Sequence, residues 1–323
     1  MSYMRPLKCC LVILVLSFPS ILYADKADYE VQVEEAVVAY NSGEYKKAHG
    51  LLLNLSEAGV AGTHLLLGVM YFKGQGVPQN YEESFKWYAK AAEQGHVVAQ
   101  YTLGSMYAKG IGTTQSYTES LNWFKASAER GHMGGQFSLG KMYLNGVGAT
   151  QDYIEAIKWL RASAEQGYVH AQYDLGVIYE NGNGTKVDFE EAVKWYQLAA
   201  EQGLAVAQYN LGYMLAHGKG VDIDFTEALR WYLLSAEQGY PEAQYNLGLM
   251  YKKGEGVPQD FKEAAKWYEL ASKQGVSNAQ LNLGVMYFKG NGVTKDKKKA
   301  LELFEKSAMQ GNKQAQRNID ALM

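Results

Sequence analysis

The chain has 323 residues, of which 47% are hydrophobic and 20% are charged, and its formal net charge at pH 7 is −3. That hydrophobic fraction excludes a disordered chain, and a weakly acidic chain with no long basic run has no electrostatic basis for binding nucleic acid. The chain holds only five prolines, which suits helices, but its 34 glycines require specific explanations.

Residues 1–24 have the layout of a secretory signal peptide. Two basic residues precede the apolar run 9–16, Pro19 interrupts the apolar character, and the small residue Ala24 ends the segment. We expect cleavage after Ala24 and a periplasmic or secreted location. The alternative is a membrane anchor, but a span needs about 20 apolar residues and Pro19 breaks the stretch. We therefore expect no stable membrane insertion after cleavage.

Both cysteines, Cys9 and Cys10, lie inside this segment. They begin the apolar run instead of following it, which argues against attachment of a lipid to the mature N-terminus. The mature chain would hold no cysteine, and so neither a disulfide nor a thiolate metal site. Removing Arg5 and Lys8 with the segment takes the net charge from −3 to −5.

A period of 36 residues runs through the rest of the chain. Leu-Gly pairs occur at 67–68, 103–104, 139–140, 175–176, 211–212, 247–248 and 283–284. Six tryptophans keep the same spacing, from Trp87 to Trp267. A fixed period in this range predicts a solenoid. Its seven units are 61–96, 97–132, 133–168, 169–204, 205–240, 241–276 and 277–312, which together fill residues 61–312.

Each unit has the pattern of two helices joined by a glycine-containing turn. In the unit 97–132, one apolar face is formed by Ala99, Leu103, Met106 and Tyr107. Gly110 and Gly112 end this first helix. A second helix starts at Ser116, where Glu119 completes a capping box in which each side chain binds a free backbone N–H. It buries Leu121, Phe124 and Ala128, so the predicted fold class is an all-α solenoid of antiparallel helix-turn-helix repeats.

A glycine also lies inside each first helix, where it costs about 1 kcal/mol relative to alanine. We expect Gly104 and its equivalents to let two helices approach closely. The expected partner is the small residue early in the second helix, such as Ser120 or Ala156.

The two ends of the array depart from the pattern. Residues 25–60 are predicted to form an N-terminal capping helix pair, and residues 313–323 a C-terminal capping helix. In this last segment Arg317 replaces the usual aromatic residue and Asp320 replaces the glycine. A polar terminal helix is what the end of a repeat array needs.

The repeated segments resemble a known family. Ala243-Gln244-Tyr245-Asn246-Leu247-Gly248, Gly254-Glu255-Gly256-Val257 and Ala265-Lys266-Trp267-Tyr268 are similar to the Sel1-like repeats, which are related to the tetratricopeptide repeats. The resemblance covers the seven units. It implies a right-handed superhelix of α-hairpins with a concave groove. It also implies an adaptor in signalling, envelope assembly or host contact.

The groove of such an array would be lined from the first helices. Positions with the same residue in every unit should pack between units, whereas positions that vary between units are free to contact a partner. The candidate groove residues are Tyr101, Ser105, Lys109, Phe137, Lys141, Tyr173, Glu180, Tyr209, Tyr213, His217, Tyr245, Lys252 and Lys253. Aromatic anchors with a basic rim would suit an extended peptide or an acidic segment. The alternative, favoured for the regular tyrosines, is that they pack between units.

The sequence offers little chemistry for catalysis. His96 and His132 occupy equivalent positions in adjacent units, and a surface pair is the favoured interpretation over a metal site. Ser138 and Lys141 match the Ser-x-x-Lys element of penicillin-recognising enzymes, but the companion elements are absent, so we treat the match as chance. We expect no enzyme, no metal and no cofactor.

Together these patterns predict an exported, monomeric scaffold that binds a protein or peptide partner, with no nucleic-acid ligand. One version is an adaptor in a bacterial envelope, and another is a secreted factor that contacts host proteins. A hydrolase acting on cell-wall or β-lactam substrates and an adaptor of a eukaryotic secretory pathway are further alternatives.

Overall fold

The computed structural model describes residues 23–58, 60 and 62–322, and all regular secondary structure in these residues is helical. The predicted all-α array of antiparallel helix pairs is confirmed. None of the described helices is long and apolar enough to cross a bilayer. The predicted signal peptide lies outside the described residues, apart from Tyr23 and Ala24, with which the first described helix begins.

The chain divides into two compact units, residues 1–166 and 167–323. The helices of the first unit are α2 (Tyr23–Asn41), α3 (Tyr45–Glu57), α4 (Gly62–Lys73), α5 (Tyr81–Glu93), α6 (Val97–Lys109), α7 (Tyr117–Glu129), α8 (Met133–Asn145) and α9 (Tyr153–Glu165). The helices of the second unit are α10 (Val169–Asn181), α11 (Phe189–Glu201), α12 (Ala205–His217), α13 (Phe225–Glu237), α14 (Pro241–Lys253), α15 (Phe261–Lys273), α16 (Ser277–Lys289), α17 (Lys297–Met309) and α18 (Lys313–Asp320).

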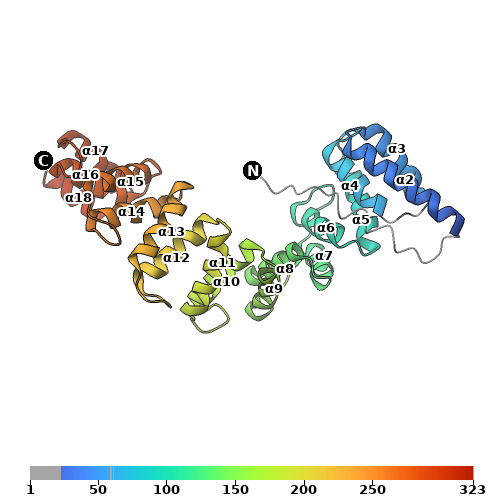
Figure 1. Ribbon diagram of the computed structural model, residues 1–323, viewed down its shortest axis with the longest axis horizontal. Helices are drawn as coiled ribbons and strands as arrows, with labels where there is room; N and C mark the ends of the chain where they lie inside the picture. The colour runs from blue at the N-terminus through green and yellow to red at the C-terminus, as the bar shows by residue number, and fades with distance from the viewer. Residues whose placement is uncertain (1–22, 59, 61, 323) are drawn as a thin grey trace. The chain divides into compact units, whose positions relative to one another are not determined.

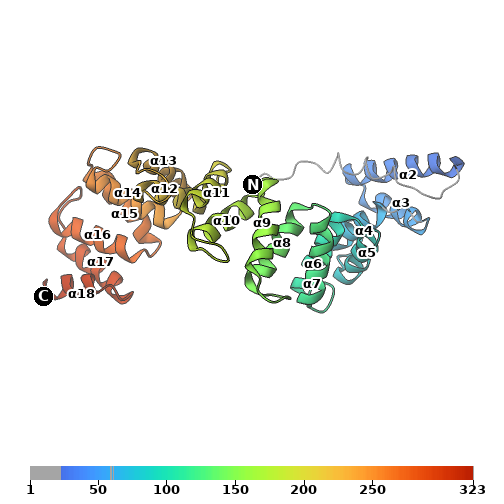
Figure 2. The ribbon, with the colours of Figure 1, turned by 90° about the horizontal axis from the view of Figure 1, so that it is seen from below.

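Within each unit, successive helices pack against each other as hairpins. The views along two directions show α4–α9 in one unit and α10–α17 in the other as neighbouring pairs, with α18 beside α17 (Figures 1 and 2). The core of a hairpin forms where the apolar face of its first helix meets its second helix. In the unit 97–132 this core contains Ala99, Leu103, Met106, Phe124 and Ala128, whereas Leu121 is only half-buried.

The start of each second helix departs from the predicted capping box. The Ser116 hydroxyl accepts a hydrogen bond from the Glu119 backbone N–H at 3.3 Å, as expected. The N–H of Ser116, however, donates to the carbonyl of Tyr107 in the preceding helix at 3.0 Å. In the next repeat Glu155 takes the position of Glu119, and its carboxylate accepts hydrogen bonds from Lys158 Nζ and Trp159 Nε1. The reciprocal half of the predicted box is thus replaced by a bond that joins the two helices of a hairpin.

The helical glycine makes room for a second group besides the predicted small residue. The small residue does approach it in some repeats, since a Cβ at Gly212 or Gly284 would lie 3.3 Å from the carbonyl oxygen of Ala228 or Ala300. A Cβ at Gly104 would lie 2.7 Å from the ring of Phe124, and one at Gly248 would lie 2.5 Å from the ring of Tyr268. The glycine therefore makes room for a large side chain one turn beyond the small residue. In the first repeat the small residue has its own role, since the Ser84 hydroxyl donates to the Gly68 carbonyl at 2.8 Å.

Within each unit, the second glycine of a turn fixes the stacking of one hairpin on the next. Gly256 has a φ of +71°, which disfavours every residue with a side chain. A Cβ there would also lie 2.3 Å from the carbonyl oxygen of Phe225, at the start of α13 in the preceding hairpin. Both the backbone conformation and the close approach between hairpins therefore require glycine.

A buried glutamine ties three consecutive helices together. Gln244 on α14 donates through Nε2 to the Ala236 carbonyl on α13 at 3.2 Å. Its Oε1 accepts a hydrogen bond from Gln274, which follows α15, at 2.8 Å. The same arrangement recurs around Gln136, Gln208 and Gln280. These bonds satisfy the amide inside the stack and set the register of adjacent hairpins.

Candidate functional site

All thirteen predicted groove residues lie on first helices, five in the first unit and eight in the second. None of them is fully buried. The exposed ones are Lys109, His217 and Lys253, and the half-buried ones are Tyr101, Ser105, Phe137, Lys141, Tyr173, Glu180, Tyr209, Tyr213, Tyr245 and Lys252. They are accessible enough to contact a partner, and their binding role stays a prediction.

The regular tyrosines also have a packing role. The ring centroid of Tyr209 lies 5.9 Å from that of Tyr232 on the second helix of its own hairpin and 5.1 Å from that of Tyr240 in the next one. Tyr173 and Tyr245 approach the equivalent rings of their own hairpins at 6.0 and 5.9 Å. Burial raises the pKa of the Tyr209 hydroxyl, as it does for the other two. These contacts agree with the alternative that the tyrosines stabilise the stack, although each keeps an exposed edge.

Glu180 is held inside its hairpin. Its Oε2 accepts a hydrogen bond from the Tyr196 hydroxyl at 2.7 Å, and burial together with this carboxylate raises the pKa of Tyr196. In the next two repeats the position of Glu180 is taken by Ala216 and Lys252. The buried hydroxyls of Tyr232 and Tyr268 have no hydrogen-bond partner among the described residues.

The rings of Tyr213 and His217 lie against each other in a tilted arrangement at the end of α12. Their ring centroids are 4.0 Å apart, and His217 Nδ1 lies 2.8 Å from the Tyr213 carbonyl oxygen. The ammonium group of Lys219 lies 4.9 Å from the Tyr213 ring and 5.3 Å from that of Phe189. These contacts restrain the Tyr213 ring within its own hairpin.

Two other candidates are engaged in local bonds. The Ser105 hydroxyl donates to the Tyr101 carbonyl one turn earlier at 3.1 Å. Lys253 forms an ion pair with Glu255 at 3.3 Å. The basic rim expected from the sequence is therefore partly neutralised at Lys253.

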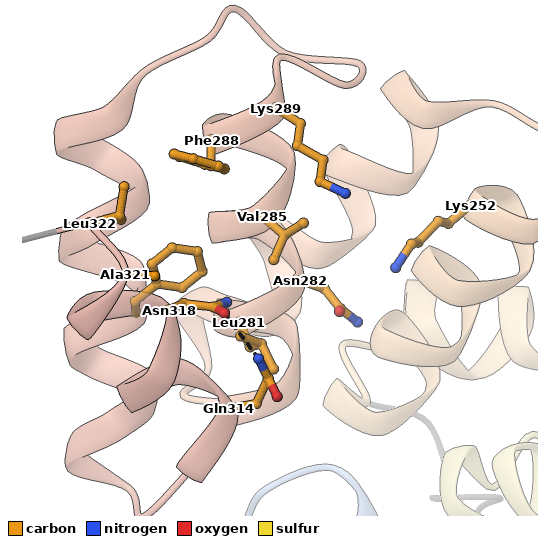
Figure 3. A pocket seen from close by; sticks show the side chains of 11 residues that line it. Lys252, Leu281, Asn282, Val285, Phe288, Lys289, Gln314, Asn318, Ala321 and Leu322 are labelled. Carbon is orange, nitrogen blue, oxygen red and sulfur yellow. Dashed lines mark hydrogen bonds between the residues drawn. The ribbon is translucent and has the colours of Figure 1, made fainter.

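A pocket of about 370 Å³ lies in the second unit, where α14, α16, α17 and α18 meet. We call it the C-terminal pocket, and it is lined by Lys252, Leu281, Asn282, Val285, Phe288, Lys289, Phe304, Gln314, Asn318, Ala321 and Leu322. Figure 3 shows Leu281, Val285 and Phe288 along one wall and the residues that follow α18 opposite them. The two lysine side chains extend toward the space between α14 and α16 (Figure 3).

Of the thirteen candidates, only Lys252 lines this pocket. Four other lining residues lie at the repeat positions of predicted groove residues but were not themselves predicted. They are Leu281, Val285, Phe288 and Lys289 on α16. Gln314 and Asn318 lie four residues apart and so share one face of α18, and Leu322 follows the end of that helix. This spacing is the sequence signal for the α18 side of the pocket.

His96 and His132 are half-buried helix N-caps, a role that the sequence analysis did not assign to them. His132 Nδ1 accepts a hydrogen bond from the Gly135 backbone N–H at 3.0 Å, and His96 accepts one from Ala99 at 3.4 Å. Burial lowers the pKa of both imidazoles. In the described part of the chain, no three His, Cys, Asp or Glu side chains are grouped so as to hold a metal ion.

The repeats match a known family model. The model described as Sel1 repeat matches residues 63–96, 97–132, 135–168, 169–204, 205–240, 241–276 and 277–312. A search of the curated proteins finds no match to this chain.

Two solved structures are similar over most of the chain. One is c5321, a protective antigen present in uropathogenic Escherichia coli strains that displays an SLR fold, with 35% identity, a TM-score of 0.88 and 93% of this chain covered. The present chain spans 65% of the length of that structure. The other is a Sel1 repeat protein from Oxalobacter formigenes, with 34% identity, a TM-score of 0.63, and 74% of this chain and 96% of that one covered.

The family model covers well over half of the residues, and both similar structures carry the same repeats. Proteins built from Sel1 repeats are generally scaffolds for protein interactions rather than enzymes. The chain belongs to the Sel1 repeat family.

Proposed function

We propose that this protein is an exported scaffold that binds a segment of a partner protein on the first helices of its second unit. The observation that carries the proposal is the C-terminal pocket, because it joins an apolar wall to two lysines at positions that vary between repeats. Pockets of this kind are the default binding sites of folded proteins. The general role of Sel1 repeats as interaction scaffolds supports this assignment.

Export is part of the proposal. It is supported by the layout of residues 1–24, in which a basic start precedes an apolar run and a small residue. The similar c5321 is a protective antigen of uropathogenic Escherichia coli strains, which is consistent with an exported location. An envelope adaptor and a secreted factor that contacts host proteins are the two versions of this function.

Affinity capture tests the binding role. The full chain would be immobilised, and the partner recovered from the producing cells or their surroundings would be identified by mass spectrometry. We expect the double variant Tyr213→Ala, Lys252→Ala to bind the partner at least about tenfold more weakly, because interface anchors carry most of the binding energy. The helical content should not change, since neither residue is fully buried.

The matched control is Lys262→Ala, which removes an exposed lysine of α15 outside the pocket. It should leave the affinity unchanged. Equal affinities for the double variant and the wild type would place the binding surface elsewhere and refute the proposal.

Cell fractionation in a Gram-negative host tests export. We expect the chain in the periplasm or the culture supernatant, with a new N-terminus at Asp25 by mass spectrometry. A full-length chain retained in the cytosol would contradict it. The compartment in which the processed chain is found separates the envelope version from the secreted one.

A further inference from the structure

We infer that the C-terminal pocket recognises an extended acidic peptide segment in which a carboxylate side chain lies next to a bulky apolar one. This inference rests on the proposed function and names the chemistry of the partner segment.

The apolar wall sets the first requirement. Val285 and Phe288 on α16 are half-buried and line the pocket, and Leu322 closes it from the far side. The fully buried Phe304 forms its base. A volume of about 370 Å³ is near the lower limit for ligand sites, so the pocket suits one bulky side chain with its backbone rather than a large cofactor.

The charge of the lining sets the second requirement. Lys252 and Lys289 come from neighbouring first helices, and none of the residues that line the pocket is acidic. Neither lysine has an ion-pair partner among the described residues, in contrast to Lys253, which is paired with Glu255. Two uncompensated ammonium groups beside an apolar wall complement a carboxylate that follows or precedes an apolar side chain.

The side-chain amides that line the pocket favour a peptide as the ligand. Asn282 lies between the lysines and the apolar wall in Figure 3, while Gln314 and Asn318 face it from α18. Gln314 donates to the Asn318 Oδ1 at 3.0 Å, which fixes the orientation of that amide. Side-chain amides can both donate and accept, so they match the alternating N–H and C=O groups of an extended backbone.

Fluorescence anisotropy with the full chain tests the inference. The probe is a labelled, end-capped peptide of the sequence Gly-Ser-Asp-Phe-Asp-Ser-Gly, compared with versions in which Asn replaces both Asp residues or Gly replaces Phe. We expect saturable binding of the first peptide that weakens with added salt. Each altered peptide should bind at least about fivefold more weakly, as loss of about 1 kcal/mol predicts.

Variants of the protein locate the binding. Lys252→Ala and Lys289→Ala should each weaken binding of the acidic peptide by about two- to fivefold, the range for an ion pair at an accessible surface. Val285→Asp should weaken it more than tenfold, because it removes apolar surface and repels the peptide. Lys262→Ala is the matched control, since it removes an exposed lysine of α15 that does not line the pocket, and it should have no effect.

The inference is overturned if the Asn peptide binds as tightly as the Asp peptide, or if neither Lys252→Ala nor Lys289→Ala weakens peptide binding. It is also overturned if the chain self-associates and Val285→Asp abolishes that association, because a second copy would then occupy the pocket. If partner capture still depends on Lys252 while no acidic peptide binds, the proposed function stands and this inference fails. If no acidic peptide binds and partner capture does not depend on Lys252, both the proposed function and this inference are refuted.

Discussion

Replacing Gly248 with alanine tests the close packing on which each hairpin depends. Gly248 lies in the middle of α14, and an added Cβ would lie 2.5 Å from two ring carbons of Tyr268. Ordinary contacts of a Cβ begin near 3.4 Å, so the overlap is 3.4 − 2.5 = 0.9 Å. Tyr268 has an exposed fraction of 0% and cannot swing into solvent.

Two effects of opposite sign determine the change in stability. Alanine stabilises a helix interior by about 1 kcal/mol relative to glycine. Forcing an extra methyl group into a packed core costs about 1–3 kcal/mol, and an overlap of this size against an immobile ring favours the upper end. We therefore expect Gly248→Ala to lower the free energy of unfolding by about 2 kcal/mol.

Urea denaturation followed by circular dichroism measures this change, and two further variants isolate its cause. Gly50→Ala is the matched control, because Gly50 is an exposed helical glycine of α3 with nothing within 4 Å of the added Cβ. It should stabilise the chain by about 1 kcal/mol. In a Tyr268→Ala background the ring is gone, so Gly248→Ala should also become stabilising.

The reasoning fails if Gly248→Ala is neutral or stabilising in the wild-type background. It also fails if the substitution destabilises the Tyr268→Ala variant to the same extent, because the ring would then not be the cause.

Two other perturbations concern the helix ends. Asp224 accepts a hydrogen bond from the Glu227 N–H at 2.9 Å at the start of α13, so Asp224→Ala should cost about 1 kcal/mol in urea denaturation, while Asp222→Ala in the preceding turn should cost almost nothing. An equal cost for both variants would contradict the capping role. The His96 and His132 caps should make the first unit pH-sensitive, because burial lowers their pKa below the ordinary 6.5 and protonation of Nδ1 removes the acceptor. The stability they contribute is present above the unfolded pKa and is lost as the pH falls through the lower folded values. The variant His96→Asn, His132→Asn keeps an acceptor, as Asn312 shows at the equivalent position, and should lose less stability between about pH 7.5 and about pH 5.5. An unchanged pH profile in that variant would refute this assignment.

Much of the fold was predictable because its signals are local. Gly110 ends a first helix with a φ of +65°, and Ser116 caps the next helix through its hydroxyl, as the sequence predicted. The repetition of these signals at every 36th residue established the hairpin and its period. Burial of Ala99, Leu103 and Met106 followed from helical periodicity in the same way.

Contacts between helices were less predictable, since they depend on how side chains lean across an interface. The Gly104 position faces the ring of Phe124 rather than the small Ser120, and the N–H of Ser116 binds Tyr107 rather than Glu119. In each case the sequence offered two possible contact groups, and the packing of the helices determines which of them makes the contact.

The candidate site was decided almost entirely by tertiary structure. The sequence identified Lys252 as a groove residue. Only the fold brings this lysine together with Asn318 and Leu322 into one cavity. A helix is encoded by residues within a few positions of each other, whereas a pocket needs side chains from four helices to converge, and that convergence follows from the packing of whole hairpins.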